Sequence, residues 1–247
     1  MLTGIQMRLL KKISPGSPAC RSECFYEGKS RLAVLMGDDF FTKIAGKVII
    51  DFGCGEGADA VEMAGNGAAR VIGLDIREDV LQAARQNALD AGVQNTCVFA
   101  HSTKELADII VSVDAFEHFA DPAEILRIMS ALLRPAGEAL ISFGPPWYHP
   151  LGGHLFSVFP WAHLIFSEKA LIGWRSAFKT DGATRFSEVA GGLNQMTIAG
   201  FKELVAGSPF KFAGLELAPI KKLRRIHNRF TREFTTAVVR CRLVKRT

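Results

Sequence analysis

The sequence predicts an α/β fold: a doubly wound, mostly parallel sheet of seven strands with helices on both faces. Two observations predict it. From residue 47 onward, short apolar segments alternate with helix-like segments, which is the pattern of strand–helix–strand units. The first apolar segment, residues 47–53, is rich in β-branched residues and ends in glycines, as expected for a strand buried on both faces.

The other elements follow in chain order. Further strands are expected over 69–75, 96–100, 108–113, 138–143, 210–218 and 234–244, and helices over 57–65, 78–91, 122–133 and 197–207. The helix over 78–91 is rich in good helix formers and is followed by Gly92. Asp121 and Pro122 are typical of an N-cap and a first helical position. A turn is expected over 134–137 before the fifth strand.

The alternation stops after residue 145, and this break predicts the domain organisation. We expect an N-terminal helical segment over 1–46 and one domain over 47–247, with an inserted lid over 145–190 after the fifth strand. All three tryptophans and three of the six histidines fall within the lid. Such side chains favour an apolar or ring-bearing ligand and exclude water, unless they form the lid's own core.

The composition excludes several classes of protein. Of the 247 residues 48% are hydrophobic and 22% are charged, which is too apolar for an intrinsically disordered chain. Charged residues interrupt every apolar stretch, so no transmembrane helix is expected. The five cysteines are scattered and form no CxxC pair, and the N-terminus has no continuous apolar region typical of a signal peptide. We therefore expect a cytoplasmic protein with reduced thiols.

The net charge of +5 is concentrated at the C-terminal end. Residues 221–247 hold ten Lys and Arg and one acid, a net +9, which leaves −4 on the first 220 residues. On a helix over 219–230, Leu223, Ile226 and Phe230 would share one face beside basic residues. That pattern is typical of peripheral contact with an anionic membrane or an acidic acceptor; a solvated connection between strands is the alternative. Nucleic acid is disfavoured, because no base-stacking or groove-reading motif accompanies the charge.

A glycine-rich loop follows the first strand, where ligands bind in such sheets. It contains Asp51, Gly53, Gly55 and Gly57, and Asp75 closes the second strand, where a carboxylate can accept hydrogen bonds from both hydroxyls of a ribose. Gly53, Gly55 and Ala58 formally match a dinucleotide fingerprint. However, Asp51 and the neighbouring Glu56 would repel a pyrophosphate and would suit an ammonium group. S-adenosyl-L-methionine carries both an ammonium group and a ribose and lacks phosphate.

These segments also resemble a known family. VIIDFGCGEGADAVEMA, VIGLDI, DAFEHFADP and LLRPAGEALISF resemble successive motifs of class I S-adenosylmethionine-dependent methyltransferases, in particular the type-11 group, over residues 47–145 and more loosely over 190–245. The resemblance implies a Rossmann-like methyltransferase fold with S-adenosyl-L-methionine as cofactor. It implies that the following residues bind that cofactor: Asp51, Gly53, Cys54, Gly55, Gly57, Asp75, Ile76, Ser102 and Val113. Relatives commonly carry an acid after the third strand; here Ser102 stands in that region instead.

Candidate catalytic residues follow the fourth and fifth strands. Glu117 and His118 lie after the fourth strand and can act as proton acceptors or shape the cofactor pocket. The same AFEHF string resembles cyclopropane fatty acid synthases. His154 and then His149, flanked by Gly or Pro in the lid, are the preferred general bases. Together with His163 their spacing matches no regular metal site, so no metal is expected.

The sequence therefore predicts a transferase that methylates a small-molecule or lipid-like acceptor, with oxygen as the favoured acceptor atom. Two alternatives remain open. One is carbon methylation or cyclopropanation of a membrane lipid. The other is a catalytically inactive protein that binds the cofactor.

Overall fold

The computed structural model describes residues 2–14, 30–153, 156, 159–179, 182–189 and 192–246. In this part of the chain one seven-stranded sheet runs in the order β3-β2-β1-β4-β5-β7-β6. Its strands are β1 (Val48–Phe52), β2 (Arg70–Leu74), β3 (Cys97–Ala100), β4 (Ala107–Val113), β5 (Leu133–Phe143), β6 (Phe210–Pro219) and β7 (Thr236–Lys245). The first five are parallel, and β7 is antiparallel to both β5 and β6. The predicted fold class is confirmed.

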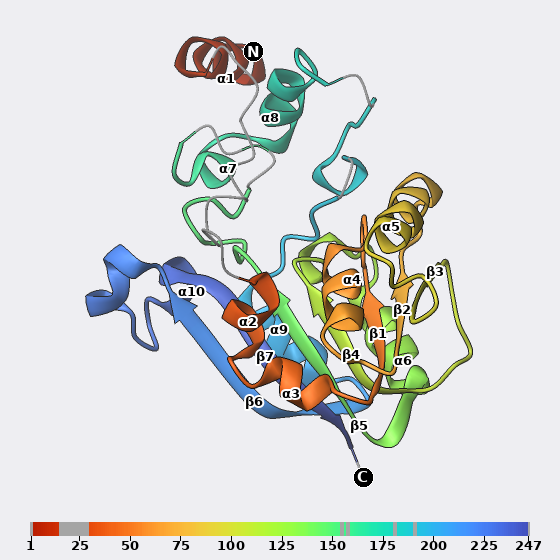
Figure 1. Cartoon of the computed structure of the whole chain (residues 1–247). Helices are drawn as coiled ribbons and strands as arrows, with labels where there is room; N and C mark the ends of the chain where they lie inside the picture. The colour runs from red at the N-terminus through yellow and green to blue at the C-terminus, as the bar shows by residue number, and fades with distance from the viewer. Residues whose placement is uncertain are drawn as a thin grey trace.

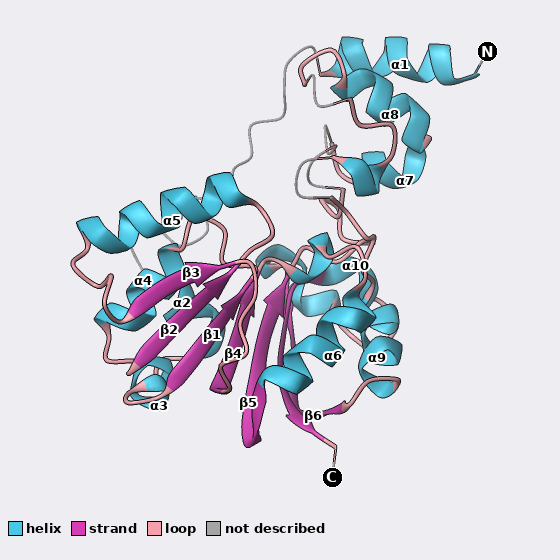
Figure 2. Cartoon of the chain, turned by 90° about the vertical axis from the view of Figure 1, so that its right-hand side faces the viewer, coloured by secondary structure: helices cyan, strands magenta, loops and turns pink. Residues whose placement is uncertain are grey.

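Helices cover both faces of the sheet (Figures 1 and 2). The α-helices are α1 (Leu2–Ile13), α2 (Arg31–Met36), α3 (Phe40–Ile44), α4 (Ala58–Gly65), α5 (Glu78–Asp90), α6 (Pro122–Leu132), α7 (Ala162–Ile165), α8 (Glu168–Arg175), α9 (Ile198–Ala206) and α10 (Arg232–Thr235). Three short 3₁₀ helices are η2 (Phe116–His118), η3 (Phe186–Glu188) and η4 (Lys221–Ile226). None of the described helices has the length and apolar character needed to cross a bilayer.

Two hydrophobic clusters hold the helices on the sheet. Helices α2, α3, α4 and α5 pack on one face, and their buried side chains join those of the sheet in one cluster. Helices α6 and α9 pack on the other face in a second cluster. The parallel strands are buried almost throughout, as expected when helices cover both faces. The Asp121 side chain caps α6 by accepting the Glu124 N–H at 2.9 Å, as the sequence predicts.

The segment after β5 has a core of its own, to which the N-terminal helix contributes. Leu10 of α1 is fully buried in a third cluster with side chains of α7 and α8 and with Phe186, Val189 and Leu193. The Trp174 indole N–H donates to the Ser14 carbonyl at 2.9 Å. Helices α1, α7 and α8 lie together beyond the carboxyl ends of the strands (Figures 1 and 2). The first 46 residues are thus divided: α1 packs with this insert, whereas α2 and α3 pack on the sheet.

Two local expectations are wrong. The turn expected over 134–137 lies inside β5, where the pairing with β4 is irregular between Ala107 and Ile109. Of the two interpretations of residues 219–230, the amphipathic helix does not form: β6 runs to Pro219, and the short 3₁₀ helix η4 ends at Ile226. The reason is Asn228, whose side-chain oxygen accepts the N–H groups of Phe230 and Thr231 at 2.8 and 3.3 Å. Such a side-chain-to-backbone turn competes with the helix.

The contact of α1 with the insert predicts different effects for two neighbouring leucines. Leu10→Ala removes a fully buried side chain and should lower the free energy of unfolding by about 2–5 kcal/mol. Leu9→Ala, at a position 47% exposed, should change it by less than about 0.5 kcal/mol. Urea unfolding followed by tryptophan fluorescence measures this directly, because all three tryptophans lie in residues 147–174. Equal effects of the two substitutions would contradict the packing of α1 against the insert.

Candidate functional site

The site lies at the carboxyl ends of the parallel strands, where three neighbouring strands each have an acidic residue near or just after their end. Asp51 lies in β1, Asp75 follows β2 and Asp114 follows β4. Because β1 pairs with both β2 and β4, these ends meet at one edge of the sheet. The insert lies beyond the same edge (Figure 1). Sheets of this kind bind ligands at this edge.

Asp51 is buried with one unsatisfied carboxylate oxygen. Its side chain is 3% exposed; the carboxylate accepts a hydrogen bond from the Ala60 backbone, whereas its Oδ2 atom has no hydrogen-bond partner among the described residues. Burial, reinforced by the negative charges of Asp59 and Asp75, raises the pKa of Asp51 well above its ordinary value; nearby Arg31 opposes this. A buried acceptor without a partner is costly. The arrangement therefore favours a ligand that brings a positively charged donor to Asp51.

Arg31, at the start of α2, lies against this acidic cluster. Its guanidinium bonds both carboxylate oxygens of Asp59 at 3.2 and 2.6 Å and approaches Asp114 Oδ2 at 3.4 Å. Burial raises the pKa of Asp114 to about 6, with Arg31 opposing and Asp59 reinforcing the shift. Sequence reasoning missed Arg31 and Asp59. No local motif marks Arg31, and only the packing of α2 on the sheet brings it to the loop after β1.

The glycines of the loop after β1 have different surroundings. A Cβ at Gly53 would lie 2.7 Å from the Ala115 side chain, and one at Gly57 would lie 2.6 Å from the Phe99 ring. Close packing of the protein thus accounts for both. A Cβ at Gly55 would meet nothing within 4 Å, although its φ of +52° still favours glycine. Gly55 is the loop residue whose outer side is open to a ligand.

Asp75 anchors this loop. Its Oδ2 accepts the Gly55 N–H at 3.1 Å, and its carboxylate is also bonded by the backbone and guanidinium of Arg77. Ile76, beside it, is 89% exposed. An apolar side chain held in solvent at this edge suits contact with a flat ring.

The other residues expected to bind the cofactor differ in how exposed their side chains are. Ser102 is exposed in the loop after β3. Val113 is buried in the core cluster on the α4 and α5 face, so its side chain packs against protein. Burial and the charges of Asp51 and Asp75 raise the pKa of the Cys54 thiol, which keeps it neutral. The structure thus brings Asp51, Gly55, Asp75, Ile76 and Cys54 together around one loop.

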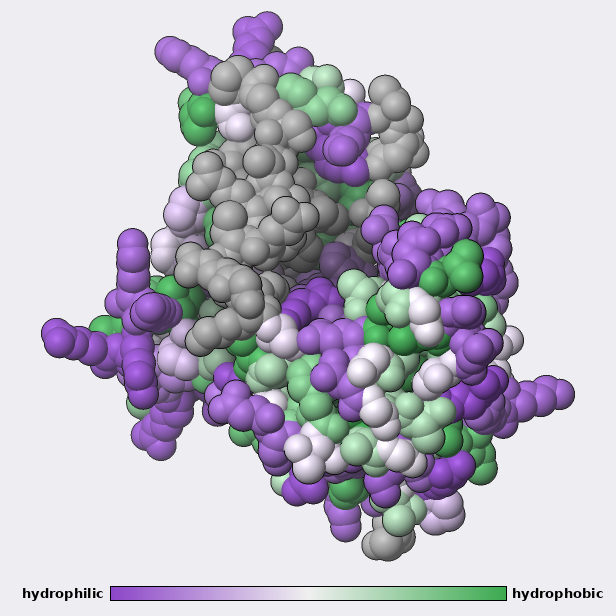
Figure 3. Space-filling view, in the orientation of Figure 1, coloured by the Kyte–Doolittle hydropathy of each residue, from purple (hydrophilic) through white to green (hydrophobic). Residues whose placement is uncertain are grey.

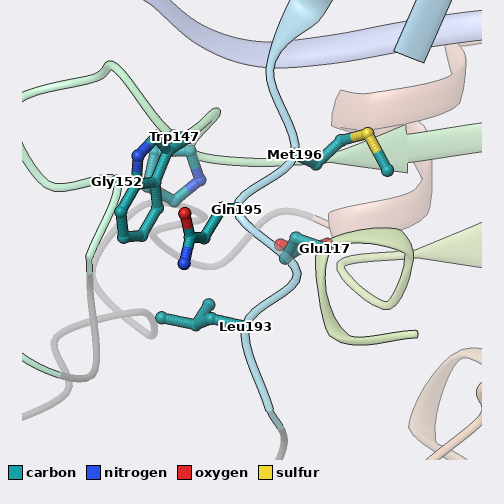
Figure 4. Close-up of a pocket in the computed structure, with 7 residues that line it drawn as sticks. Glu117, Trp147, Gly152, Leu193, Gln195 and Met196 are labelled. Atoms are coloured by element: carbon teal, nitrogen blue, oxygen red, sulfur yellow. The ribbon is translucent and has the colours of Figure 1, made fainter. Parts of the chain in front are cut away.

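Glu117, in η2, is the second buried carboxylate of the site. It is 4% exposed; its Oε1 accepts the Gly144 N–H at 3.3 Å, and its Oε2 has no partner among the described residues. Burial, with a contribution from the charge of Asp114, raises the pKa of Glu117 to about 8. The side chain lines a small pocket (Figure 4). The other lining residues are Pro145, Trp147, Gly152, Leu193, Gln195 and Met196.

Hydrogen bonds hold the segment between the insert and α9 against η2. The Asn194 side-chain amide donates to the carbonyls of Phe116 and Phe119 at 2.8 and 2.9 Å, and its backbone N–H donates to the Glu117 carbonyl. His118 Nδ1 lies 2.7 Å from the Gly192 carbonyl. Gln195 has a φ of +58°, a strained conformation for a residue other than glycine, costing about 1–3 kcal/mol. Sequence reasoning missed Asn194 and Gln195, because their partners are remote in sequence.

The structure describes only one of the two histidines that the sequence favours as general bases. His154 lies outside the described residues. His149 is 9% exposed, its Nδ1 accepts the Leu151 N–H at 2.9 Å, and burial lowers its pKa to about 4. A histidine with this pKa is neutral at pH 7 but is a weak base. Its neighbour His163 is hydrogen-bonded to the Trp147 carbonyl.

Most described aromatic side chains of the insert form its own core. The buried ones in this cluster are Phe156, Phe166, Trp174 and Phe186, with Phe159 and Phe178 packed against them. Trp147 contacts this core and also lines the pocket beside Glu117, whereas Tyr148 and Trp161 lie outside the cluster and are partly exposed. The expectation that the aromatic residues select the acceptor therefore rests on Trp147 in the described part of the insert.

Comparison with known proteins identifies the part of the chain that holds the acidic cluster. Residues 43–144 match the family model described as a methyltransferase domain. We call this segment the methyltransferase domain after the family model that it matches. The sheet to which it belongs has the fold of class I methyltransferases. The domain contains all the residues expected to bind the cofactor, together with Glu117 and His118, and it ends where the insert begins.

Two relatives and two solved structures illustrate the similarity. The chain is 37% identical over 103 residues to the ubiquinone biosynthesis O-methyltransferase of Aeromonas salmonicida, covering 39% of this chain and 43% of that protein. The Escherichia coli protein of the same name is 35% identical over 103 residues, covering 39% and 42%. The chain thus spans less than half the length of the curated relatives it matches.

The solved structures extend the likeness of fold beyond this domain. An S-adenosylmethionine-dependent methyltransferase from Mesorhizobium loti superposes with a TM-score of 0.57 at 18% identity, covering 90% of this chain and 100% of that one. A magnesium protoporphyrin IX methyltransferase from Synechocystis, with its cofactor bound, gives a TM-score of 0.50 at 17% identity, covering 87% and 76%. At these sequence identities the similarity shows that the folds are alike and nothing further.

The residues of the methyltransferase domain fit the cofactor. The unpaired Oδ2 of Asp51 matches an ammonium donor, the open side of Gly55 leaves room beside the loop, and Asp75 offers carboxylate oxygens near the exposed Ile76. In this structure Arg77 bonds the Asp75 carboxylate. Arg77 therefore has to release at least one oxygen for a ribose to be held there.

The raised pKa of Glu117 predicts how stability depends on pH. The folded protein keeps the proton up to about pH 8, whereas the unfolded chain loses it near pH 4.5. The folded state thus binds more protons in that window, and each pH unit lowers the free energy of unfolding by about 1.4 kcal/mol. Glu117→Gln should remove this contribution. Urea unfolding of both proteins between pH 5 and pH 9 measures the difference.

The matched control is Glu124→Gln, which neutralises an exposed glutamate on α6. This variant should follow the wild-type pH dependence. If Glu117→Gln also followed it, Glu117 would have an ordinary pKa in the folded protein.

Proposed function

We propose that this protein is an S-adenosyl-L-methionine-dependent methyltransferase that methylates a hydroxyl oxygen of a small or lipid-like acceptor. The observation that carries the proposal is the buried carboxylate of Asp51 within the methyltransferase domain, whose Oδ2 atom has no hydrogen-bond partner among the described residues. An acidic cluster at the carboxyl ends of the strands favours a ligand with positive charge and disfavours a dinucleotide. We also propose that the protein acts in the cytoplasm, in keeping with the free thiols of Cys54, Cys97 and Cys241.

Each residue around the loop after β1 would bind a different part of the cofactor. Asp51 would accept the ammonium group, and Arg31 would pair with the carboxylate of the methionine end. Asp75 would hold the ribose hydroxyls, and Ile76 would contact the adenine ring. Ser102 is the proposed partner of the adenine amino group.

Glu117 is the proposed proton acceptor. When bound, S-adenosyl-L-methionine supplies an electrophilic methyl group on a sulfonium sulfur, so the protein has to align the acceptor oxygen and remove its proton. Glu117 lines the pocket, its Oε2 atom has no hydrogen-bond partner among the described residues, and its pKa is about 8. That pKa makes it a stronger base than His149, whose pKa is about 4. His118 would position η2 through its contact with Gly192, and His154 stays a predicted base.

The pocket favours an acceptor with an apolar body. Trp147, Leu193 and Met196 supply apolar walls, while Gln195 supplies an amide that extends toward Trp147 (Figure 4). Apolar walls with few polar groups are typical of sites for ring-bearing ligands. The relatives named as ubiquinone biosynthesis O-methyltransferases support a ring-bearing hydroxyl acceptor. We propose that residues 145–190 cover this acceptor as a lid.

Formation of S-adenosylhomocysteine tests the proposal. The protein is incubated with S-adenosyl-L-methionine and catechol, an alkylated catechol or an unsaturated phospholipid, and both products are identified by mass spectrometry. We expect methylation of a catechol oxygen, with kcat rising as pH increases through about 8 because Glu117 then becomes ionised. Glu117→Gln should lower kcat about 10²–10⁴-fold with the KM for the cofactor unchanged, and Glu124→Gln should have no effect.

Two results would contradict the proposal. Methylation of the phospholipid chain, without reaction of either catechol, would favour the carbon-methylating alternative. Cofactor binding without turnover of any acceptor would favour a protein that holds the cofactor without using it.

A further inference from the structure

The connection between β6 and β7, residues 219–235, is an exposed basic segment that we call the β6–β7 tip. Its cations are Lys221, Lys222, Arg224, Arg225, Arg229 and Arg232. The first five are exposed, and no ion pair to them is found within the described ranges. The one acid of the tip, Glu233, caps α9 by accepting the N–H groups of Ile198 and Ala199 at 3.0 and 2.8 Å. The positive charge of the tip is therefore not neutralised locally.

Large apolar side chains are exposed among these cations. Ile226 is 54% exposed, Phe230 is 77% exposed and Phe234 is 44% exposed. The turn that presents Phe230 is fixed, because Asn228 Oδ1 accepts the Phe230 N–H and the Thr231 hydroxyl donates to the Ile226 carbonyl. Exposed apolar side chains that gather in one segment, unlike those scattered singly, indicate an interaction surface.

The β6–β7 tip lies at the edge of the sheet that carries the site. Pro219 of β6 pairs with Thr236 of β7, near where β5 ends beside Val239. The Phe234 ring contacts the Tyr148 ring of the insert, with centroids 5.4 Å apart, and Trp161 donates to the Tyr148 carbonyl. Tyr148 and Trp161 are themselves partly exposed. Long hydrophilic side chains project from the η4 and α10 region, with hydrophobic surface between them (Figure 3).

We infer that the β6–β7 tip docks on the surface of an anionic lipid membrane, with Phe230 and Ile226 entering the headgroup region. Unneutralised cations around exposed apolar side chains match what such a surface binds: phosphate headgroups and the boundary of the acyl chains. A nucleic acid fits less well, since the Arg229 guanidinium already covers one face of the Phe230 ring at 4.5 Å from its centroid. That face is closed to base stacking.

Docking at this place would bring the insert close to the lipid surface. Tyr148 lies in the chain that leads from β5 to the pocket-lining Gly152, and Phe234 contacts Tyr148 directly. A lipid-like acceptor would then reach the insert without crossing bulk water. This consequence rests on the proposed function, whereas the docking itself does not.

Co-sedimentation with vesicles tests the docking. The full chain is mixed with vesicles of phosphatidylcholine alone or with about one third phosphatidylglycerol, at low and at high salt. We expect binding to the anionic vesicles, weakened by salt. Ile226→Ser with Phe230→Ser should lower the partition coefficient at least about fivefold, and Arg224→Glu with Arg225→Glu should lower it at least about tenfold.

The matched control is Lys104→Glu with Lys211→Glu, which makes the same change in charge at exposed positions away from the tip. It should change the partition coefficient less than about twofold. Far-UV circular dichroism confirms the fold of each variant, and S-adenosylhomocysteine binding, measured in parallel without vesicles, separates failure of the docking from failure of the proposed function.

The docking would be overturned by absence of binding to anionic vesicles at low salt, or by equal binding of the tip variants and the control. Binding of a single-stranded oligonucleotide without binding of vesicles would overturn it in favour of nucleic acid.

Discussion

The buried carboxylate of Asp51 is the constraint on which the site depends. Its Oδ2 atom has no hydrogen-bond partner in the described part of the chain, Asp59 and Asp75 add negative charge, and Arg31 opposes them. Such an arrangement is unfavourable without a ligand, because a buried charge needs a compensating partner. A cationic donor would satisfy the unpaired oxygen and lower the pKa of Asp51 at the same time. Folding of the surrounding sheet thus leaves Asp51 Oδ2 without a donor, and binding of a cationic ligand would supply that donor.

The parallel sheet makes this arrangement possible. Hydrophobic clusters on both faces fix the strands, and the pairing of β1 with β2 and β4 brings the three acidic strand ends together. The insert adds the other wall. Asn194 fastens its return segment to η2, which places Glu117 against the pocket. One side of the site therefore carries the charges for a cofactor, and the other carries a candidate base and an apolar wall.

The sequence predicted the sheet and the loop well because both are local patterns. Each strand is a short apolar segment, and Asp51, Gly55 and Asp75 lie at fixed positions relative to strand ends. Arg31 and Asn194 were missed because their roles depend on contacts across 28 and about 75 residues of sequence. The helix expected over 219–230 failed because the Asn228 turn outweighs the apolar spacing.

Binding of S-adenosylhomocysteine, measured by isothermal titration calorimetry in buffers of different ionisation enthalpy, tests the role of Asp51 most directly. The account predicts binding with release of protons near the raised pKa of Asp51, since the ammonium group favours the ionised carboxylate. Asp51→Asn should lose that release and bind at least about tenfold more weakly. Asp39→Asn, which changes an exposed N-cap without a side-chain hydrogen bond, should match wild type. No binding to the wild-type protein, or unchanged binding and proton release in Asp51→Asn, would contradict the account.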